Sequence, residues 1–168
     1  MPASDQGIER DRYLFMLGTL IFLTYEDRVL LLKGAPDKRV WSERYNGVGG
    51  RIERGEDVLN AARRELLEET GIEVLDLWLC GTITVDASED VGVALFVLRG
   101  ECQTMAAPLA SREGVLQWVP FDEIHSLPVV EDLPILLPRV LQAKPGDPPF
   151  AAHYSYDEGE RLVICFAE

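Results

Sequence analysis

The stretch from Gly50 to Ile72 constrains the fold of this chain more than any other segment. It reads GRIERGEDVLNAARRELLEETGI, and its apolar residues recur at helical spacing over residues 58–70. Glu65, Glu68 and Glu69 are three and four residues apart, so they share one face of that helix. Carboxylates this close repel one another unless a cation lies among them. Hard oxygen ligands of this kind suit Mg²⁺, so the segment predicts a helix that holds a metal.

The residues around these carboxylates complete a known pattern. Five residues separate Gly50 from Glu56, seven separate Glu56 from Arg64, and Gly71 follows where a helix would end. The stretch resembles, at every defining position, the signature of the Nudix hydrolases: G, five residues, E, seven residues, REUxEExGU, with U an aliphatic residue. The resemblance implies an α/β fold, an α/β/α sandwich with a mixed central sheet and a loop–helix–loop signature.

The resemblance also implies a chemistry, the hydrolysis of a diphosphate linked to another moiety. Such a reaction needs cations at the phosphate oxygens, with Mg²⁺ expected and Mn²⁺ as the alternative. The implied metal ligands are the carbonyl of Gly49 and the carboxylates of Glu65, Glu68, Glu69 and Glu113. The alternative for Glu113 is an exposed loop glutamate, and for the three helical glutamates it is a solvated acidic helix face.

Four residues of the signature are candidates for catalysis. Glu65 or Glu68 would orient the attacking water and accept its proton. Arg64 would pair with Glu56 and hold the loop against the helix.

Two pairs of residues outside the signature resemble base-recognition segments of MutT-like enzymes. Tyr45-Asn46 precedes Gly47, as in a WNGxGG stretch with Tyr in place of Trp, and Glu131-Asp132 stands where oxidised-purine triphosphatases have two aspartates. An amide offers both a donor and an acceptor to a purine edge. The stacking Trp expected two residues before the acidic pair is replaced by Val129. An ordinary turn at Asn46-Gly47 and a helix cap at the acidic pair remain as alternatives.

These features predict an enzyme that converts a nucleoside triphosphate, with an oxidised purine such as 8-oxo-dGTP preferred, to a monophosphate and pyrophosphate. The alternatives are a Nudix pyrophosphatase for ADP-ribose or another nucleotide, and a non-catalytic Nudix binding module.

Composition limits the partners of the chain. Its 168 residues suit a single domain over 1–168, with residues 1–12 as a loose N-terminal segment. A net charge of −13 argues against a nucleic acid polymer as partner. The apolar run Tyr13–Tyr25 is too short to span a membrane and reads as a buried strand. The 3 cysteines form no CxxC pair, so we expect free thiols in a reducing cytoplasm. The expected oligomeric state is a monomer or a homodimer.

The remaining pattern predicts strands and two further helices. Glu131–Leu141 is the longer predicted helix, and Pro138 is expected to kink or interrupt it. A short helix is expected at Phe121–His125. The predicted strands are 14–24, 28–33, 74–86, 91–100 and 115–120, followed by a closing hairpin of 150–156 and 161–166.

Overall fold

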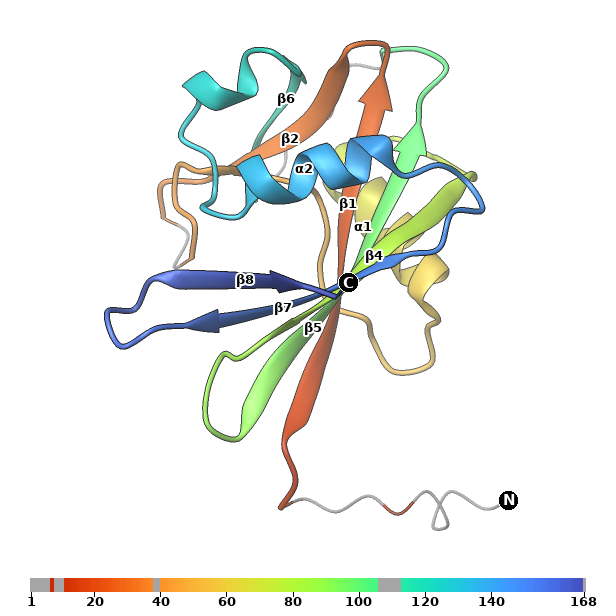
Figure 1. Ribbon diagram of the computed structural model, residues 1–168. Coiled ribbons are helices and arrows are strands. Elements are labelled where there is room, and N and C mark those ends of the chain that lie inside the picture. The colour runs from red at the N-terminus through yellow and green to blue at the C-terminus, as the bar shows by residue number, and fades with distance from the viewer. Residues whose placement is uncertain (1–6, 8–10, 38–39, 106–112, 168) are drawn as a thin grey trace.

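The computed structural model describes residues 7, 11–37, 40–105 and 113–167. The predicted loose N-terminal segment, residues 1–12, lies almost wholly outside these ranges. The elements are β1 (Leu14–Tyr25), β2 (Arg28–Gly34), β3 (Tyr45–Asn46), α1 (Val58–Thr70), β4 (Leu77–Val85), β5 (Val91–Glu101), β6 (Gly114–Pro120), a 3₁₀ turn (Ile124–Ser126), α2 (Leu133–Gln142), β7 (Phe150–Tyr156) and β8 (Leu162–Phe166) (Figure 1). No helix among the described residues is long and apolar enough to cross a membrane.

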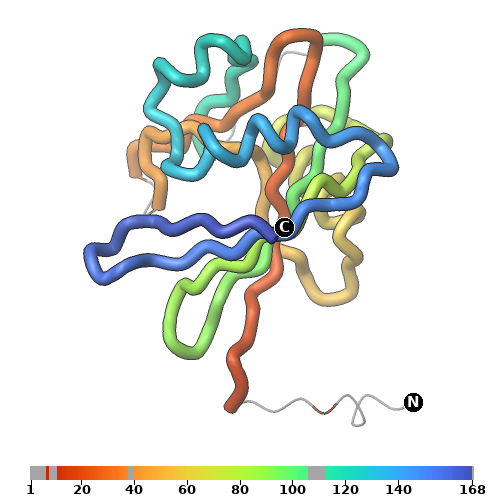
Figure 2. The backbone as a smooth tube through the Cα atoms, viewed as in Figure 1, coloured from red at the N-terminus to blue at the C-terminus, as the bar shows by residue number. Residues whose placement is uncertain are grey.

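The strands form one mixed sheet in the order β3-β2-β1-β5-β4-β7-β8, with β6 paired to β2. The pairs β1–β5 and β4–β7 are parallel, and the other pairs are antiparallel. The β7–β8 hairpin extends to the same side of the molecule as the β4–β5 hairpin (Figure 2). The mixed sheet predicted from the resemblance is confirmed.

The apolar run of β1 is explained by cover on both faces of the sheet. Leu20 and Phe22 pack into the cluster that includes α2, whereas Ile21 and Leu23 pack into the cluster that includes α1. Figure 1 shows α2 in front of the sheet and α1 behind it. Because side chains alternate along a strand, a strand that is covered on both faces must be apolar at successive positions.

Helix α1 has the predicted bounds because local signals mark both ends. The Asp57 side chain caps the N-terminus by accepting from the N–H groups of Leu59 and Asn60, both at 2.9 Å. Gly71 ends the helix in the left-handed conformation with φ 67°, which an L side chain adopts at a cost. Leu66 on the inner face is completely buried. The helix is therefore fixed against the sheet, with its acidic face turned away from the core.

Helix α2 differs from the prediction in two respects. It begins at Leu133 rather than Glu131, and it runs on through Pro138 without interruption. The two prolines of α2 and Ile135 are exposed on its outer face. Water can bond there to a carbonyl group that has lost its N–H partner. Leu136 and Val140 are buried on the inner face and hold the helix against the core. The expected interruption is therefore wrong.

Candidate active site

A cavity of about 680 Å³ opens between β1, the loop after β2, the segment before α2 and the β7–β8 hairpin. It brings together residues that are far apart in the sequence. Those expected from the sequence are Asn46, Gly49, Glu69, Glu113, Glu131 and Asp132. The phosphate-processing signature and the predicted base-recognition segments therefore face one space.

The signature loop is attached to β1 through its backbone. Thr19 donates its N–H to the carbonyl of Gly50 at 2.8 Å, and Ile21 donates to the carbonyl of Val48 at 2.7 Å. These bonds occupy the edge of β1 that β2 leaves open. They place the Gly49-Gly50 turn at the wall of the cavity.

Two of the predicted metal ligands lie against this turn. The Gly49 N–H donates to Oε2 of Glu69 at 3.3 Å. The Glu65 carboxyl group lies 2.5 Å from where a Cβ on Gly50 would stand, so only glycine leaves it room. Helix α1 thus presents Glu65 and Glu69 to the backbone of the loop.

Arg64 is the cation among the carboxylates. Its guanidinium donates to both carboxylate oxygens of Glu56 at 2.7 and 2.9 Å, to Glu65 at 2.8 Å and to Glu68 at 3.2 Å. It also donates to the carbonyl of Arg51 at 3.1 Å. The Arg64–Glu56 pair expected from the sequence is therefore present in bidentate form, which fixes the guanidinium plane.

These contacts shift the pKa values of both partners. Hydrogen bonds from Arg64 and from the backbone N–H of Glu53 lower the pKa of Glu56 from 4.5 to about 2. The same bond to Glu56, together with that to Glu65, raises the pKa of Arg64 further above its usual range. The pair stays charged throughout the physiological pH range.

We expect the stabilising effect of Glu56 to depend on pH. Because the folded-state pKa lies below the unfolded value, its contribution is complete above pH 4.5 and is lost as the pH falls toward about 2. The melting temperatures of wild type and Glu56→Gln should therefore differ most above pH 5 and converge below pH 4.5. Thermal unfolding across this range measures the difference. A constant difference, or one that grows in acid, would contradict the pairing, and Arg64→Gln should remove the pH dependence as well.

The donor set fits a divalent cation, although the side chains are not arranged around one. No three acidic, His or Cys side chains of the described chain are grouped as a metal site, and Arg64 donates hydrogen bonds to Glu65 and Glu68. The carboxylates and the Gly49 carbonyl are the hard oxygen donors that Mg²⁺ prefers. Among the described residues, the acidic side chains on the cavity wall are Glu69, Glu113, Glu131 and Asp132, and the basic ones are Arg44 and Arg51. With acids in excess, an anionic ligand needs added cations here.

The predicted base-recognition residues lie at the other side of the cavity. Asn46 accepts the N–H of Gly47 through Oδ1 at 2.8 Å, which orients its amide and leaves the NH₂ donors for a ligand. Glu131 is exposed and Asp132 is half-buried. Burial is the main cause that raises the pKa of Asp132; the charge of Glu131 also raises it, and the Tyr154 hydroxyl opposes the shift. Asp132 does not cap α2 through its side chain, which leaves its carboxyl group free of that role.

Tyr45 is placed differently from the prediction. Its side chain is buried, its hydroxyl donates to Oε1 of Gln117 at 2.9 Å, and it is not among the residues that line the cavity. The backbone of Tyr45 bonds to Pro128 and Val130, both at 3.0 Å. Tyr45 thus brings Asn46 beside the segment that carries Asp132, while its ring lies in the core and not on the cavity wall.

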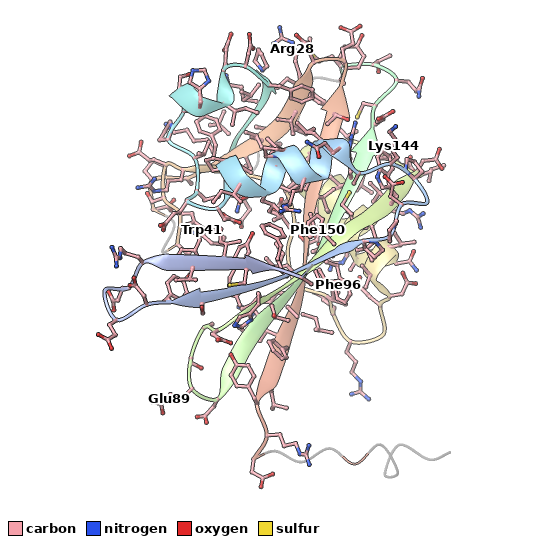
Figure 3. The ribbon with its side chains drawn as sticks, viewed as in Figure 1. Arg28, Trp41, Glu89, Phe96, Lys144 and Phe150 are labelled. Carbon is pink, nitrogen blue, oxygen red and sulfur yellow. The ribbon has the colours of Figure 1, made fainter. Side chains whose placement is uncertain are left out.

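Sequence reasoning missed three aromatic residues of the cavity wall, which are Trp41, Tyr154 and Tyr156. Trp41 has an exposed side chain and a positive φ of 57°, and it lies toward the β7–β8 hairpin (Figure 3). Tyr154 enters from β7, and nothing near it in the sequence indicates the cavity.

The profile of the NUDIX domain matches residues 14–140. The chain belongs to the Nudix hydrolase family. The oxidized purine nucleoside triphosphate hydrolase of Mus musculus is 30% identical to this Nudix hydrolase over 150 residues, covering 88% of this chain and 90% of the relative. The protein of the same name from Danio rerio is 31% identical over 137 residues, covering 75% and 80% of the two chains.

A solved structure supports the same placement. The MutT protein of Bacillus halodurans superposes on this Nudix hydrolase with a TM-score of 0.75 at 25% identity, covering 90% of this chain and 97% of the other. The predicted fold is thereby confirmed, and members of the family generally use divalent metal ions.

Proposed function

We propose that this Nudix hydrolase converts a purine nucleoside triphosphate to the monophosphate and pyrophosphate, with an oxidised purine preferred and Mg²⁺ as the metal. One observation carries the proposal. A single cavity is lined both by the Gly49-Gly50 turn with Glu69 and by Asn46 and Asp132. The names of the mouse and zebrafish relatives support the same base class. The three cysteines are free thiols, which supports a reducing cytoplasm as the location.

The signature side of the cavity suits the triphosphate. Glu65, Glu68, Glu69, Glu113 and the Gly49 carbonyl would hold the metal, which when bound would neutralise charge on the phosphate oxygens. Glu68 has a side chain that is 60% exposed, so it can accept a proton from an attacking water. Arg64 and Glu56 keep the signature loop against α1.

The opposite side suits a purine edge. Asn46 and Asp132 place an amide and a carboxyl group on the same cavity wall. A site built from such groups rejects a base that leaves them unpaired, because each buried polar group without a partner costs free energy. Asn46 and Asp132 are therefore the residues expected to separate an oxidised purine from an unmodified one.

A product assay over a nucleotide panel tests the proposal. The panel contains 8-oxo-dGTP, dGTP, ADP-ribose and diadenosine polyphosphates, each with Mg²⁺ or Mn²⁺. The expected result is the highest kcat/KM for 8-oxo-dGTP, with pyrophosphate as product. A higher kcat/KM for ADP-ribose would show the alternative pyrophosphatase, and no hydrolysis of any member would favour a binding module.

Asn46→Ala and Asp132→Asn are expected to lower the preference for 8-oxo-dGTP over dGTP by about tenfold each, the effect of one lost hydrogen bond of about 1–3 kcal/mol. The ratio of kcat/KM values for the two nucleotides is the measurement. Asp122→Asn, an exposed acid that does not line the cavity, is the matched control. Unchanged preference in both cavity variants would remove these residues from base recognition.

A further inference from the structure

Tyr154 carries a buried hydroxyl group that has no hydrogen-bond partner in the part of the chain that the structure describes. Its side chain is only 4% exposed, yet it lines the cavity. Water satisfies an exposed hydroxyl, but a buried one without a partner destabilises the protein that contains it. An unsatisfied group on a cavity wall therefore indicates that a ligand provides the missing partner.

The backbone of β7 fixes this hydroxyl in position. Tyr154 is paired with Val85 of β4 on one side and with Ile164 of β8 on the other. Its carbonyl accepts the N–H of Asp86 at 3.0 Å. Because the strand is held on both edges, the backbone fixes the face of the sheet from which the Tyr154 side chain projects.

The carboxyl group of Asp132 acts on this hydroxyl. Burial, and then the charge of Asp132, raise the pKa of Tyr154 above its usual range, so the hydroxyl remains protonated and available as a donor. The Asp132 carboxyl group acts on the hydroxyl both as a charge and as a distant acceptor, but the contact does not reach hydrogen-bond geometry. The cavity wall thus presents a buried donor beside a carboxyl group that does not satisfy it.

We propose that Tyr154 is a specificity-determining residue whose hydroxyl donates a hydrogen bond to a carbonyl oxygen of an oxopurine base, beside Asp132. The inference deepens the proposed function and rests on it for the class of base. A base with a carbonyl oxygen accepts a hydrogen bond from the Tyr154 hydroxyl, whereas a base without one leaves the hydroxyl unpaired in the complex. The discrimination arises because the cost of the unpaired hydroxyl is removed only by the correct base.

Tyr154→Phe tests this role because it removes the oxygen and keeps the ring. We expect KM for 8-oxo-dGTP to rise about tenfold, with kcat within about twofold, since one hydrogen bond to the base is lost. KM for purine riboside triphosphate, whose base has no carbonyl, should not change. The melting temperature of the ligand-free protein should stay constant or rise by roughly 2–4 °C, because an unsatisfied buried group has been removed.

Tyr25→Phe is the matched control. Tyr25 is half-buried, packs edge-on against Trp118 and is not among the cavity-lining residues. Its hydroxyl is not among the buried atoms that lack a hydrogen-bond partner. Removing it should leave both KM values and the melting temperature unchanged.

A structural role for the Tyr154 hydroxyl gives the opposite pattern. If it mainly supports Asp132, Tyr154→Phe lowers the melting temperature and changes KM equally for both triphosphates, and either result overturns the inference. Binding of 8-oxo-dGMP, measured as thermal stabilisation, tests the contact without turnover and should be weaker in Tyr154→Phe. If wild type neither binds nor hydrolyses oxopurine nucleotides, the proposed function fails and this inference fails with it. If wild type does so and Tyr154→Phe matches it, only this inference fails.

Discussion

Glu68→Gln is expected to lower the metal-dependent kcat by roughly 10²–10⁴-fold while the protein remains folded. Glu68 is 60% exposed, and its described ion pair is the one with Arg64 at 3.2 Å. Exposed pairs of this kind contribute about 0–1 kcal/mol, so the melting temperature should fall by no more than roughly 4 °C. A neutral amide neither holds a cation strongly nor accepts a proton from water. Steady-state kinetics across a Mg²⁺ titration and thermal unfolding measure the two effects.

Glu73→Gln is the control, because Glu73 is an exposed glutamate just after α1 that lies outside the main cavity. It should retain full activity. Mg²⁺ should stabilise wild type and Glu73→Gln against heating, but should stabilise Glu68→Gln less. Full turnover in Glu68→Gln would remove Glu68 from the metal and proton-transfer roles. Glu65 is a less clean test, because its side chain is only 14% exposed and is bonded to Arg64, so its loss would also disturb the loop.

The signature could be predicted from the sequence because its determinants are local. Asp57 and Gly71 mark the ends of α1 by their own chemistry, and the spacing of Glu65 and Glu69 places them on one face. The Arg64–Glu56 pair follows from the family pattern and is present. Local signals of this kind need no knowledge of what packs against the helix.

The rest of the site depends on contacts between distant segments. Tyr45 was predicted to contact substrate, but its ring is buried beside Gln117, and only the pairing of β2 with both β3 and β6 determines this. Tyr154 reaches the cavity because β7 pairs in parallel with β4. No short sequence motif predicts this pairing between distant strands. The alternation of side chains along a strand predicts which face of the sheet a residue lies on, but it does not predict which distant residues contact it.

Helix α2 shows how packing can override a local rule. Pro138 interrupts a helix in most sequence contexts, since it removes an N–H donor and clashes with the preceding turn. Here Leu133, Leu136 and Val140 are completely buried in the core, and this anchoring holds the helix together across the proline. The burial follows from the fold and could not be read from the ten residues of the helix alone.

Gly49→Ala is expected to reduce the free energy of unfolding by about 3 kcal/mol or more, which corresponds to a fall of roughly 6–12 °C in melting temperature. The φ of Gly49 is 149°, and a Cβ there would stand 2.1 Å from the carbonyl oxygen of Thr19. That carbonyl belongs to β1, which is paired with β5 and bonded to Gly50, so it cannot move aside. Activity at a temperature where the variant is folded should also fall, because Gly49 donates to the Glu69 carboxylate.

Gly55→Ala separates the steric cost from the conformational one. Gly55 lies in the same loop and has a positive φ of 93°, but no heavy atom lies within 4 Å of its Cβ position. Alanine there should cost only about 1 kcal/mol and should leave kcat nearly unchanged, because the Glu65 and Glu69 contacts are kept. Equal losses of stability in the two variants would mean that backbone conformation alone requires glycine at residue 49. A larger loss in Gly49→Ala, together with reduced kcat, would show that the close approach of the loop to β1 positions the carboxylates of α1.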